Sequence, residues 1–286
     1  MSGPQNGSIP PRTNGAGPKE LESLCCELKT KVDNFLDTPT DDEVLNSVKS
    51  QIIIARGVID EALRRYRPEE LSLSYNGGKD CLVLLILILA SLPSSVSLQP
   101  SQTSPTQPIQ PTTPSTLTTP PPPFPRSLQA LYIRPDQPFA EVDEFVSATT
   151  ATYHLDLTTS NQAMKPALTA YLRERPEVKA VFVGTRRTDP HGAALTFFDE
   201  TDADWPRFMR IHPVIDWHYR EVWGFIRALG IPYCSLYDKG YTSLGGIHDT
   251  HPNPALKGNG SKADGEQFRP AYELMEDKEE RLGRDR

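Results

Sequence analysis

Residues 71–90 read LSLSYNGGKDCLVLLILILA, and this stretch decides the fold of the chain. The β-type run 71–75 leads into NGGKD at 76–80, and ten apolar residues follow at 81–90. The pattern predicts a strand, a tight turn and a buried helix. A helix that begins after a glycine turn directs its unpaired N–H groups and positive dipole end at the turn, where phosphate is the usual ligand. The segment 76–80 is therefore a candidate phosphate-binding loop; the alternative is a turn that uses its glycines only for tightness.

Two side chains of this loop carry charge. Lys79 adds a mobile positive charge beside the glycines, and Asp80 places a carboxylate at the start of the helix. That carboxylate can hold a metal ion or hold the loop itself. Neither the Walker pattern nor the dinucleotide fingerprint G-x-G-x-x-G occurs here, so these two phosphate-binding loops are excluded.

The segments on both sides of the loop alternate between helix and strand patterns. Helical patterns precede it at 18–36 and 41–66. After it, strand patterns alternate with helical ones in the order 129–135, 138–150, 153–158, 164–175 and 179–185. The alternation predicts an α/β fold with N-terminal helices and a doubly wound, mostly parallel sheet. Because ligands bind beyond the carboxyl ends of such strands, we expect the loops after the first and last strands to face one crevice.

The loop after the last of these strands is also charged. It reads VFVGTRRTDPHG at 181–192 and contains Gly184, Arg186, Arg187 and Asp189. Guanidinium groups pair bidentately with phosphate oxygens, and a carboxylate fixed by a following proline can hold a metal or orient a nucleophile. The alternative for this segment is a solvated loop with a surface ion pair.

Two segments are too polar or too rich in proline to build a core. Residues 1–17 are rich in Gly, Pro, Asn and Ser, and we expect them to be disordered. Residues 93–127 contain eleven of the 28 prolines, and we expect a flexible insertion there. A single domain, 18–286, would then be interrupted by this insertion. The run PPPPFP at 120–125 is an alternative docking segment for an aromatic-lined groove of a partner.

Composition excludes several classes of protein. The net charge of −7 argues against a general nucleic-acid surface, and the apolar run 81–92 is too short to span a membrane. The four cysteines form no C-x-x-C pair, and His248 and His251 lack further close ligands for zinc. The N-terminal segment has no apolar signal core. We therefore expect a cytoplasmic protein that binds neither nucleic acid nor membrane, and we expect a monomer.

The phosphate-binding loop also resembles a known signature. SYNGGKDC at 74–81 is similar to the PP-loop, S-G-G-x-D-S, of enzymes that split ATP between its α and β phosphates, and it departs from that signature at Asn76 and Cys81. These departures resemble the version in eukaryotic, fungal-type FAD synthetases (FMN adenylyltransferases) of the PAPS-reductase-like PP-loop superfamily. Further segments resemble that family's elements in the family's order: GTRRTDP at 184–190, TDADWP at 201–206 followed by an arginine, GYTSLG at 240–245, and RPAYELMEDKEERLGR at 269–284.

The resemblance implies the reaction ATP + FMN → FAD + pyrophosphate with Mg²⁺, on a PP-loop ATP pyrophosphatase-like (adenine nucleotide alpha hydrolase-like) fold with an irregular or helical C-terminal extension. The implied ATP contacts are Ser74, Tyr75, Asn76, Gly77, Gly78, Lys79, Asp80, Tyr132, Ile133, Gly184, Arg186 and Arg187. The implied FMN contacts are Asp189, Asp202, Trp205 and Arg210. The implied catalytic residues are Asn76, Asp80, Asp189, Arg281 and Arg284, with Asp80 and Asp189 as metal ligands. The two tail arginines, three positions apart, are expected on one face of a helix that folds back over the crevice.

Three other functions remain open at this point. A sulfonucleotide reductase shares the PP-loop fold but should carry a redox cysteine near its C-terminus, and the chain has none after Cys234. A tRNA-modifying ATP pyrophosphatase is disfavoured by the absence of C-x-x-C pairs and of a basic surface. The third is an inactive flavin- or nucleotide-binding regulator, and the intact Lys79, Asp80 and Asp189 argue instead for activity.

Overall fold

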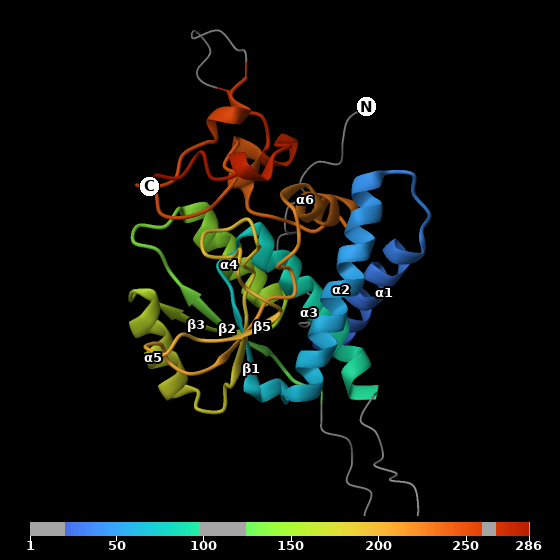
Figure 1. The fold of residues 1–286 in the computed structure, drawn as a ribbon, viewed down its shortest axis with the longest axis vertical. Coiled ribbons are helices and arrows are strands. Elements are labelled where there is room, and N and C mark those ends of the chain that lie inside the picture. The colour runs from blue at the N-terminus through green and yellow to red at the C-terminus, as the bar shows by residue number, and fades with distance from the viewer. Residues whose placement is uncertain (1–20, 98–123, 259–266, 286) are drawn as a thin grey trace, which may run out of the picture.

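The computed structural model describes residues 21–97, 124–258 and 267–285. At its centre lies a six-stranded sheet with the strand order β3-β2-β1-β4-β6-β5 (Figure 1). The strands are β1 (Leu71–Ser74), β2 (Leu128–Ile133), β3 (Leu155–Ser160), β4 (Ala180–Phe182), β5 (Phe198–Glu200) and β6 (Met209–Ile211). Every neighbouring pair is parallel except β5–β6, which confirms the doubly wound, mostly parallel sheet.

The order of the strands locates the binding edge of the sheet. From β1 the chain passes to β2 and β3 on one side, and then returns to place β4 on the other side of β1. The topology therefore switches between β1 and β4, and the crevice at such a switch point is where open α/β sheets bind ligands. The two charged loops identified in the sequence leave the sheet at this point, one after β1 and one after β4.

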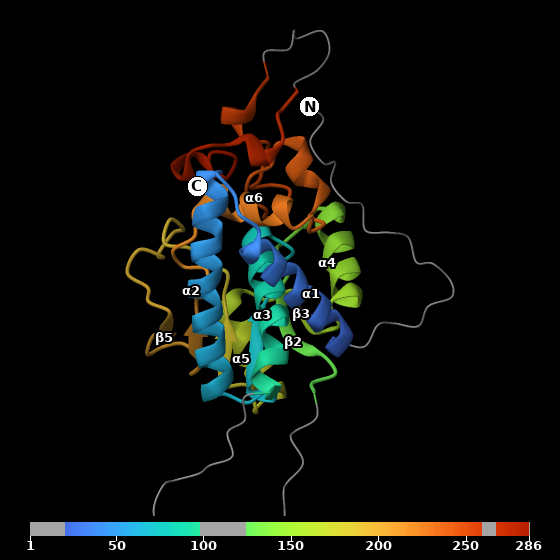
Figure 2. The same ribbon diagram turned by 90° about the vertical axis from the view of Figure 1, so that its right-hand side faces the viewer.

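Helix α3 (Lys79–Ser97) occupies the centre of the molecule. Its ten apolar residues 81–90 are all buried, because α1 (Leu21–Asp37) and α2 (Glu43–Arg65) pack against it on the side away from the sheet (Figure 2). A helix that is apolar on every face is stable only in such a position. Asp42 caps the start of α2 by accepting hydrogen bonds from two backbone N–H groups, Val44 N at 2.8 Å and Leu45 N at 3.1 Å. Within the part of the chain that the structure describes, no helix is long and apolar enough to cross a membrane.

Three further helices complete the α/β core. Helices α4 (Ala140–Thr152) and α5 (Met164–Glu174) agree with the expected helical patterns. Helix α5 covers the face of the sheet opposite α3, where Leu168 and Tyr171 pack against Leu131 and Val181 of the strands. Helix α6 (Tyr219–Ala228) packs against α2 and α3.

The structure differs from the sequence-based expectations at the end of α3 and in strands β5 and β6. Helix α3 continues through Pro93 to Ser97, so the expectation that the insertion begins at residue 93 is wrong. The remainder of that insertion within 98–123, and the N-terminal residues 1–17, lie outside the described residues. Strands β5 and β6, each three residues long, were not expected, since an alternation of polar and apolar residues has no detectable period over so short a run.

The C-terminal part of the chain is irregular and covers the end of the molecule where α3 begins (Figure 1). After α6, the described residues form only short 3₁₀ turns, at Ser235–Lys239, Pro254–Leu256, Ala271–Glu273 and Asp277–Glu279. The expected helix that would carry both tail arginines is therefore wrong. The tail nevertheless folds back over the crevice, which Glu280, Arg281 and Arg284 line, and an isolated β-bridge joins Arg284 to Thr250.

Candidate active site

The loops after β1 and β4 face one crevice of about 230 Å³, as the sequence predicted. Two C-terminal segments form its other walls. The lining residues are Ser74, Asn76, Gly78, Lys79, Asp80, Cys81, Val183, Gly184, Thr185, Asp189, Tyr237, Ser243, Leu244, Glu280, Arg281 and Arg284. The crevice thus brings together all five residues that the family resemblance implies for catalysis.

The turn between β1 and α3 has the geometry that its glycines suggest. Gly77 has φ +72°, and a Cβ atom there would lie 2.8 Å from a methyl group of Val146 on α4. The side-chain oxygen of Asn76 accepts hydrogen bonds from Gly78 N and from the Cys81 thiol, both at 2.9 Å. The two positions at which the loop departs from the PP-loop signature are therefore hydrogen-bonded to each other, and this bond fixes the turn.

The second loop approaches the start of α3 closely because of Gly184. A Cβ atom at this position would lie 2.9 Å from the backbone nitrogen of Cys81. Any other residue would push the two loops apart. The close approach brings Asp189 into the same crevice as Asp80.

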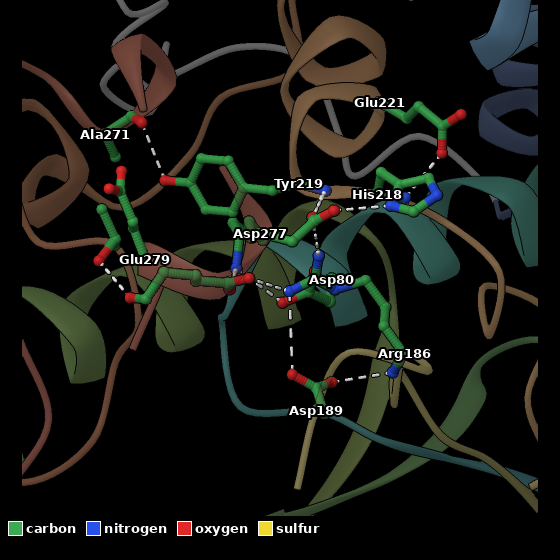
Figure 3. A network of polar contacts seen from close by, with 12 residues as sticks. Asp80, Arg186, Asp189, His218, Tyr219, Glu221, Ala271, Asp277 and Glu279 are labelled. Atoms are coloured by element: carbon green, nitrogen blue, oxygen red, sulfur yellow. Dashed lines mark hydrogen bonds and ion pairs between the residues drawn. The ribbon is translucent and has the colours of Figure 1, made fainter. Parts of the chain in front are cut away.

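Beneath the crevice lies a buried ion cluster of Lys79, Asp80, Arg186 and Glu280. Lys79, Arg186 and Glu280 are 1%, 0% and 5% exposed. The carboxylate of Asp80 is 3.0 Å from Lys79 Nζ and 2.8 Å from Arg186 Nε. The carboxylate of Glu280 binds the same two cations through its two oxygens, accepting from Lys79 Nζ and from Arg186 Nη2 (Figure 3 shows Asp80 and Arg186 within the surrounding polar network). Two cations and two carboxylates thus balance inside the protein, as buried charges require.

The charges of this cluster are stabilised by one another. Burial alone would raise the pKa of Asp80, but the cations of Arg186 and Lys79 outweigh burial and hold that pKa below its ordinary value. Conversely, burial would lower the pKa of Lys79, and the carboxylates of Asp80 and Glu280 raise it above its ordinary value. Lys79 and Asp80 therefore both stay ionised near neutral pH.

Three residues expected to bind ATP lie differently from the expectation. Lys79 was expected to be a mobile charge, yet its ammonium group is buried and held by two carboxylates. Arg187 does not line the crevice, since its guanidinium group binds Asp216 at 2.6 Å and two backbone carbonyl groups of its own loop. Tyr75 is fully buried, and its hydroxyl donates to Thr149 Oγ1 at 2.9 Å. Arg187 and Tyr75 thus lie outside the set that lines the crevice, whereas Lys79 lines it with its charge already paired.

The two carboxylates implied as metal ligands, Asp80 and Asp189, both line the crevice and differ in their partners. Both oxygens of Asp80 are paired with cations of the buried ion cluster. Asp189 lines the crevice with its side chain 25% exposed; its Oδ2 accepts from Arg186 N at 2.8 Å, and its Oδ1 lies 3.8 Å from Arg186 Nη2. In the described part of the chain, no three His, Cys, Asp or Glu side chains are grouped to hold a metal ion. Mg²⁺ needs only one or two carboxylates when phosphate oxygens complete its coordination.

The two tail arginines differ sharply in their contacts. Arg284 is tied down, because its guanidinium group binds Asp249 Oδ2 at 3.0 Å and the carbonyl oxygen of Leu244 at 2.9 Å. Gly245 leaves the space for it, since a Cβ atom there would lie 2.4 Å from Arg284 Nη2. Arg281 is exposed in the crevice, and its guanidinium group has no hydrogen bond or ion pair with any residue that the structure describes. Arg281 is therefore a cation available to a ligand.

Apart from Asp189, the residues implied for flavin and adenine lie outside the set that lines this crevice. Trp205 packs at the margin of the apolar cluster on the α5 face of the sheet, and Arg210 contacts the carbonyl oxygen of Glu200 at 2.9 Å and lies 4.0 Å from Asp202. On the other face, the Tyr132 hydroxyl donates to Asp143 at 3.3 Å. Ile133 packs at the margin of the same α5-face cluster as Trp205.

Sequence reasoning missed Glu280 and Tyr237, both of which line the crevice. Glu280 stands in a run of alternating acids and bases, EDKEER at 276–281, which is typical of a solvated surface. Tyr237 precedes the GYTSLG segment and carries no signal of its own. The only indication in the sequence is that Glu280 directly precedes Arg281 in the segment that resembles the family's closing element.

Comparison with known proteins places this geometry in a family. A family model described as the phosphoadenosine phosphosulfate reductase domain matches residues 161–252. A protein of Schizosaccharomyces pombe (strain 972) named "Probable FAD synthase" is 36% identical over 265 residues, which are 93% of this chain and 89% of that protein.

Two crystal structures of Candida glabrata FMN adenylyltransferase are similar to the chain over nearly its whole length. The one in complex with FAD and inorganic pyrophosphate has a TM-score of 0.82 at 27% identity, covering 95% of this chain and 99% of that one. The one in complex with FMN and the ATP analog AMPCPP has a TM-score of 0.79 at 26% identity, covering 93% and 100%. With its PP-loop, its switch-point crevice and this extent of similarity, the chain belongs to the FAD synthase family.

Proposed function

We propose that the chain is an FMN adenylyltransferase that transfers AMP from ATP to FMN and releases pyrophosphate. The observation that carries this proposal is the unpaired Arg281 guanidinium group in the crevice next to the phosphate-binding loop, in a chain of the FAD synthase family. An oxygen of the FMN phosphate attacks the α-phosphorus of ATP, a new P–O bond forms, and the bond between the α-phosphorus and the bridging oxygen to the β-phosphate breaks.

This chemistry needs positioning and charge neutralisation and no strong base. The FMN phosphate is already ionised near neutral pH, so the protein does not have to remove a proton from the nucleophile. The positive end of the α3 dipole lies beside the loop 76–80 and attracts the ATP phosphates, while the N–H groups of Gly78 and Lys79 donate to Asn76 and Tyr237 within the protein. Arg281 supplies positive charge where charge develops on the transferring phosphate. The ion pairs of the buried ion cluster fix the loop after β1 and the loop after β4 relative to each other.

Asp189 is the residue that we assign to magnesium. Its carboxylate faces the crevice, and its Oδ1 has no hydrogen bond among the described residues. When bound, Mg²⁺ would neutralise the triphosphate and the departing pyrophosphate. Asp80, in contrast, acts through Lys79 and Arg186 by holding their cations in place.

The activity is tested by incubating the purified protein with Mg-ATP and FMN and separating the flavins by chromatography. FAD and pyrophosphate in equal amounts are the expected products. Binding of both substrates without FAD formation would instead support the inactive regulator. Reduction of a sulfonucleotide by a thiol donor would support the reductase, although the chain has no cysteine after Cys234.

Trp205→Ala is expected to raise the KM for FMN about tenfold and to leave the KM for ATP within about twofold. We assign Trp205, with Asp202 and Arg210, to the flavin because a half-exposed tryptophan beside acids and a cation suits a planar heterocycle. Loss of one stacked aromatic face costs up to about 1.4 kcal/mol, which corresponds to this factor. Steady-state kinetics with each substrate varied in turn measure it, and Trp205→Phe is the matched control. An equal rise in both KM values would contradict the assignment.

Replacing residues 98–123 with a short Gly/Ser linker is expected to leave the rate of FAD formation within about threefold. The replaced segment starts at the far end of α3, about 27 Å along the helix from the phosphate-binding loop. Long surface connections change the free energy of unfolding only slightly. Initial rates and melting temperatures of the two proteins measure the effect. A hundredfold loss of rate with an unchanged melting temperature would assign the segment to the reaction.

Three expectations from the sequence stay predictions. Gel filtration with light scattering tests for a monomer, and fractionation of cells tests for a cytoplasmic location. A binding assay of PPPPFP peptides with aromatic-grooved domains tests for a proline-reading partner.

A further inference from the structure

Tyr237 lies in the wall of the crevice and is held rigidly. It belongs to the 3₁₀ turn Ser235–Lys239 and is 1% exposed. Its ring packs edge-on against Trp223 at 5.1 Å and against Tyr233 at 6.3 Å between ring centroids. The oxygen of its hydroxyl accepts a hydrogen bond from the backbone N–H of Lys79, the first residue of α3, at 2.9 Å. The side chain therefore cannot turn its hydroxyl away from the phosphate-binding loop.

The hydroxyl proton of Tyr237 is left without an acceptor. The bond to Lys79 uses the oxygen as acceptor, and no other described residue forms a hydrogen bond with this hydroxyl. A buried donor without an acceptor costs free energy, so such groups are rare unless a ligand satisfies them. Since Tyr237 lines the crevice, its proton can be satisfied by a ligand there.

Two features make this hydroxyl a good donor to an anion. Burial raises the pKa of Tyr237 well above its ordinary value, so the hydroxyl keeps its proton near neutral pH. The N–H group that it accepts from lies at the positive end of the dipole of α3. Accepting this bond polarises the O–H group and strengthens it as a donor. The Tyr237 hydroxyl thus presents to the crevice an O–H donor that is polarised by the first N–H group of the helix.

We propose that Tyr237 is a catalytic residue that donates a hydrogen bond to a phosphate oxygen of ATP, and of the pyrophosphate product, at the start of α3. The inference rests on the proposed function and adds a residue to it. No proton is transferred; the bond stabilises the negative charge on the departing group.

Tyr237→Phe tests the proposal, because it removes the hydroxyl and keeps the ring that packs against Trp223. We expect kcat/KM for ATP to fall about 10- to 100-fold, and inhibition by pyrophosphate to weaken by a similar factor. The KM for FMN should stay within about twofold. Tyr233→Phe is the matched control: its hydroxyl donates to Asp238 at 2.9 Å, it does not line the crevice, and its loss should leave these constants unchanged.

A second measurement separates a role in phosphate binding from a purely structural one. Magnesium pyrophosphate should raise the melting temperature of the unaltered protein, and this rise should be much smaller for Tyr237→Phe. If Tyr237 only supports the start of α3, the variant melts lower without ligand but shows the full rise with pyrophosphate, and the proposal is wrong. Unchanged kcat/KM for ATP would also overturn it.

The same measurement distinguishes failure of this inference from failure of the proposed function. If the unaltered protein makes no FAD, the proposed function fails. A smaller pyrophosphate-dependent rise in Tyr237→Phe than in the unaltered protein would still support the hydroxyl as a phosphate ligand.

Discussion

Arg281→Ala is expected to lower the rate of FAD formation about a hundredfold and to leave the free energy of unfolding within about 0.5 kcal/mol. Arg281 is exposed in the crevice, and among the described residues no partner holds its guanidinium group. Its removal therefore breaks no folded contact. Loss of one preorganised donor to the transferring phosphate raises the barrier by about 3 kcal/mol. Single-turnover rates and urea unfolding curves measure the two quantities.

Arg269→Ala is the matched control for this prediction. Arg269 is also an exposed arginine of the C-terminal region, but it pairs with Glu273 and does not line the crevice. Its replacement should leave the rate within about twofold. If Arg281→Ala is as active as Arg269→Ala, the charge of Arg281 does not act on the transferring phosphate. A large loss of stability in Arg281→Ala would show that the side chain has a structural role instead.

Glu280→Ala is expected to lower the free energy of unfolding by about 3 to 5 kcal/mol. The carboxylate of Glu280 binds both Lys79 and Arg186, and all three residues are at most 5% exposed. Removing it leaves two buried cations that share Asp80 as their remaining close partner. Breaking a buried pair by removing one member costs this much because the other charge stays desolvated. Urea or thermal unfolding measures the loss.

Glu276→Ala provides the comparison, since Glu276 is an exposed acid of the same segment. Its replacement should change the free energy of unfolding by no more than about 0.5 kcal/mol. Glu280→Gln keeps the volume of the side chain and turns an N–H donor toward one of the cations, so it should also be destabilising. Equal stability of Glu280→Ala and Glu276→Ala would mean that water replaces the carboxylate at no cost.

The parts of the fold that could be predicted are those set by a short stretch of sequence or by the general rules of sheet topology. The apolar run 81–90 had to be a central helix, and the two charged loops had to meet because each follows a parallel strand on either side of the switch point. Hydrophobic period and topology rules suffice for such statements. Strands β5 and β6 were missed because three residues are too few to show a period.

The expectations about the site that were wrong concern residues whose partners lie in distant segments of the chain. The pattern of acids and bases in 276–281 favours a helix with i,i+4 pairs, but Glu280 is drawn into the interior by Lys79 and Arg186. Gly283 then packs so tightly that a Cβ atom would lie 2.3 Å from the carbonyl oxygen of His251. No local rule reports such partners, so the expected free cation at Lys79 and the expected helix of the tail failed for the same reason.

The salt bridge between Lys79 and Glu280 joins residues 201 positions apart, and this separation has a consequence for synthesis of the chain. A protein leaves the ribosome with its N-terminal part first, at roughly 5–20 residues per second, and begins to fold as it emerges. The sheet and α3 can therefore assemble while Lys79 and Arg186 still lack one of their carboxylates. A nascent chain that stalls before residue 280 has only Asp80 as a close partner for its two buried cations, and its crevice lacks the residues of the C-terminal segment that line it. Such a chain should be inactive and a preferred substrate for quality-control proteases, so that only the finished polypeptide makes FAD.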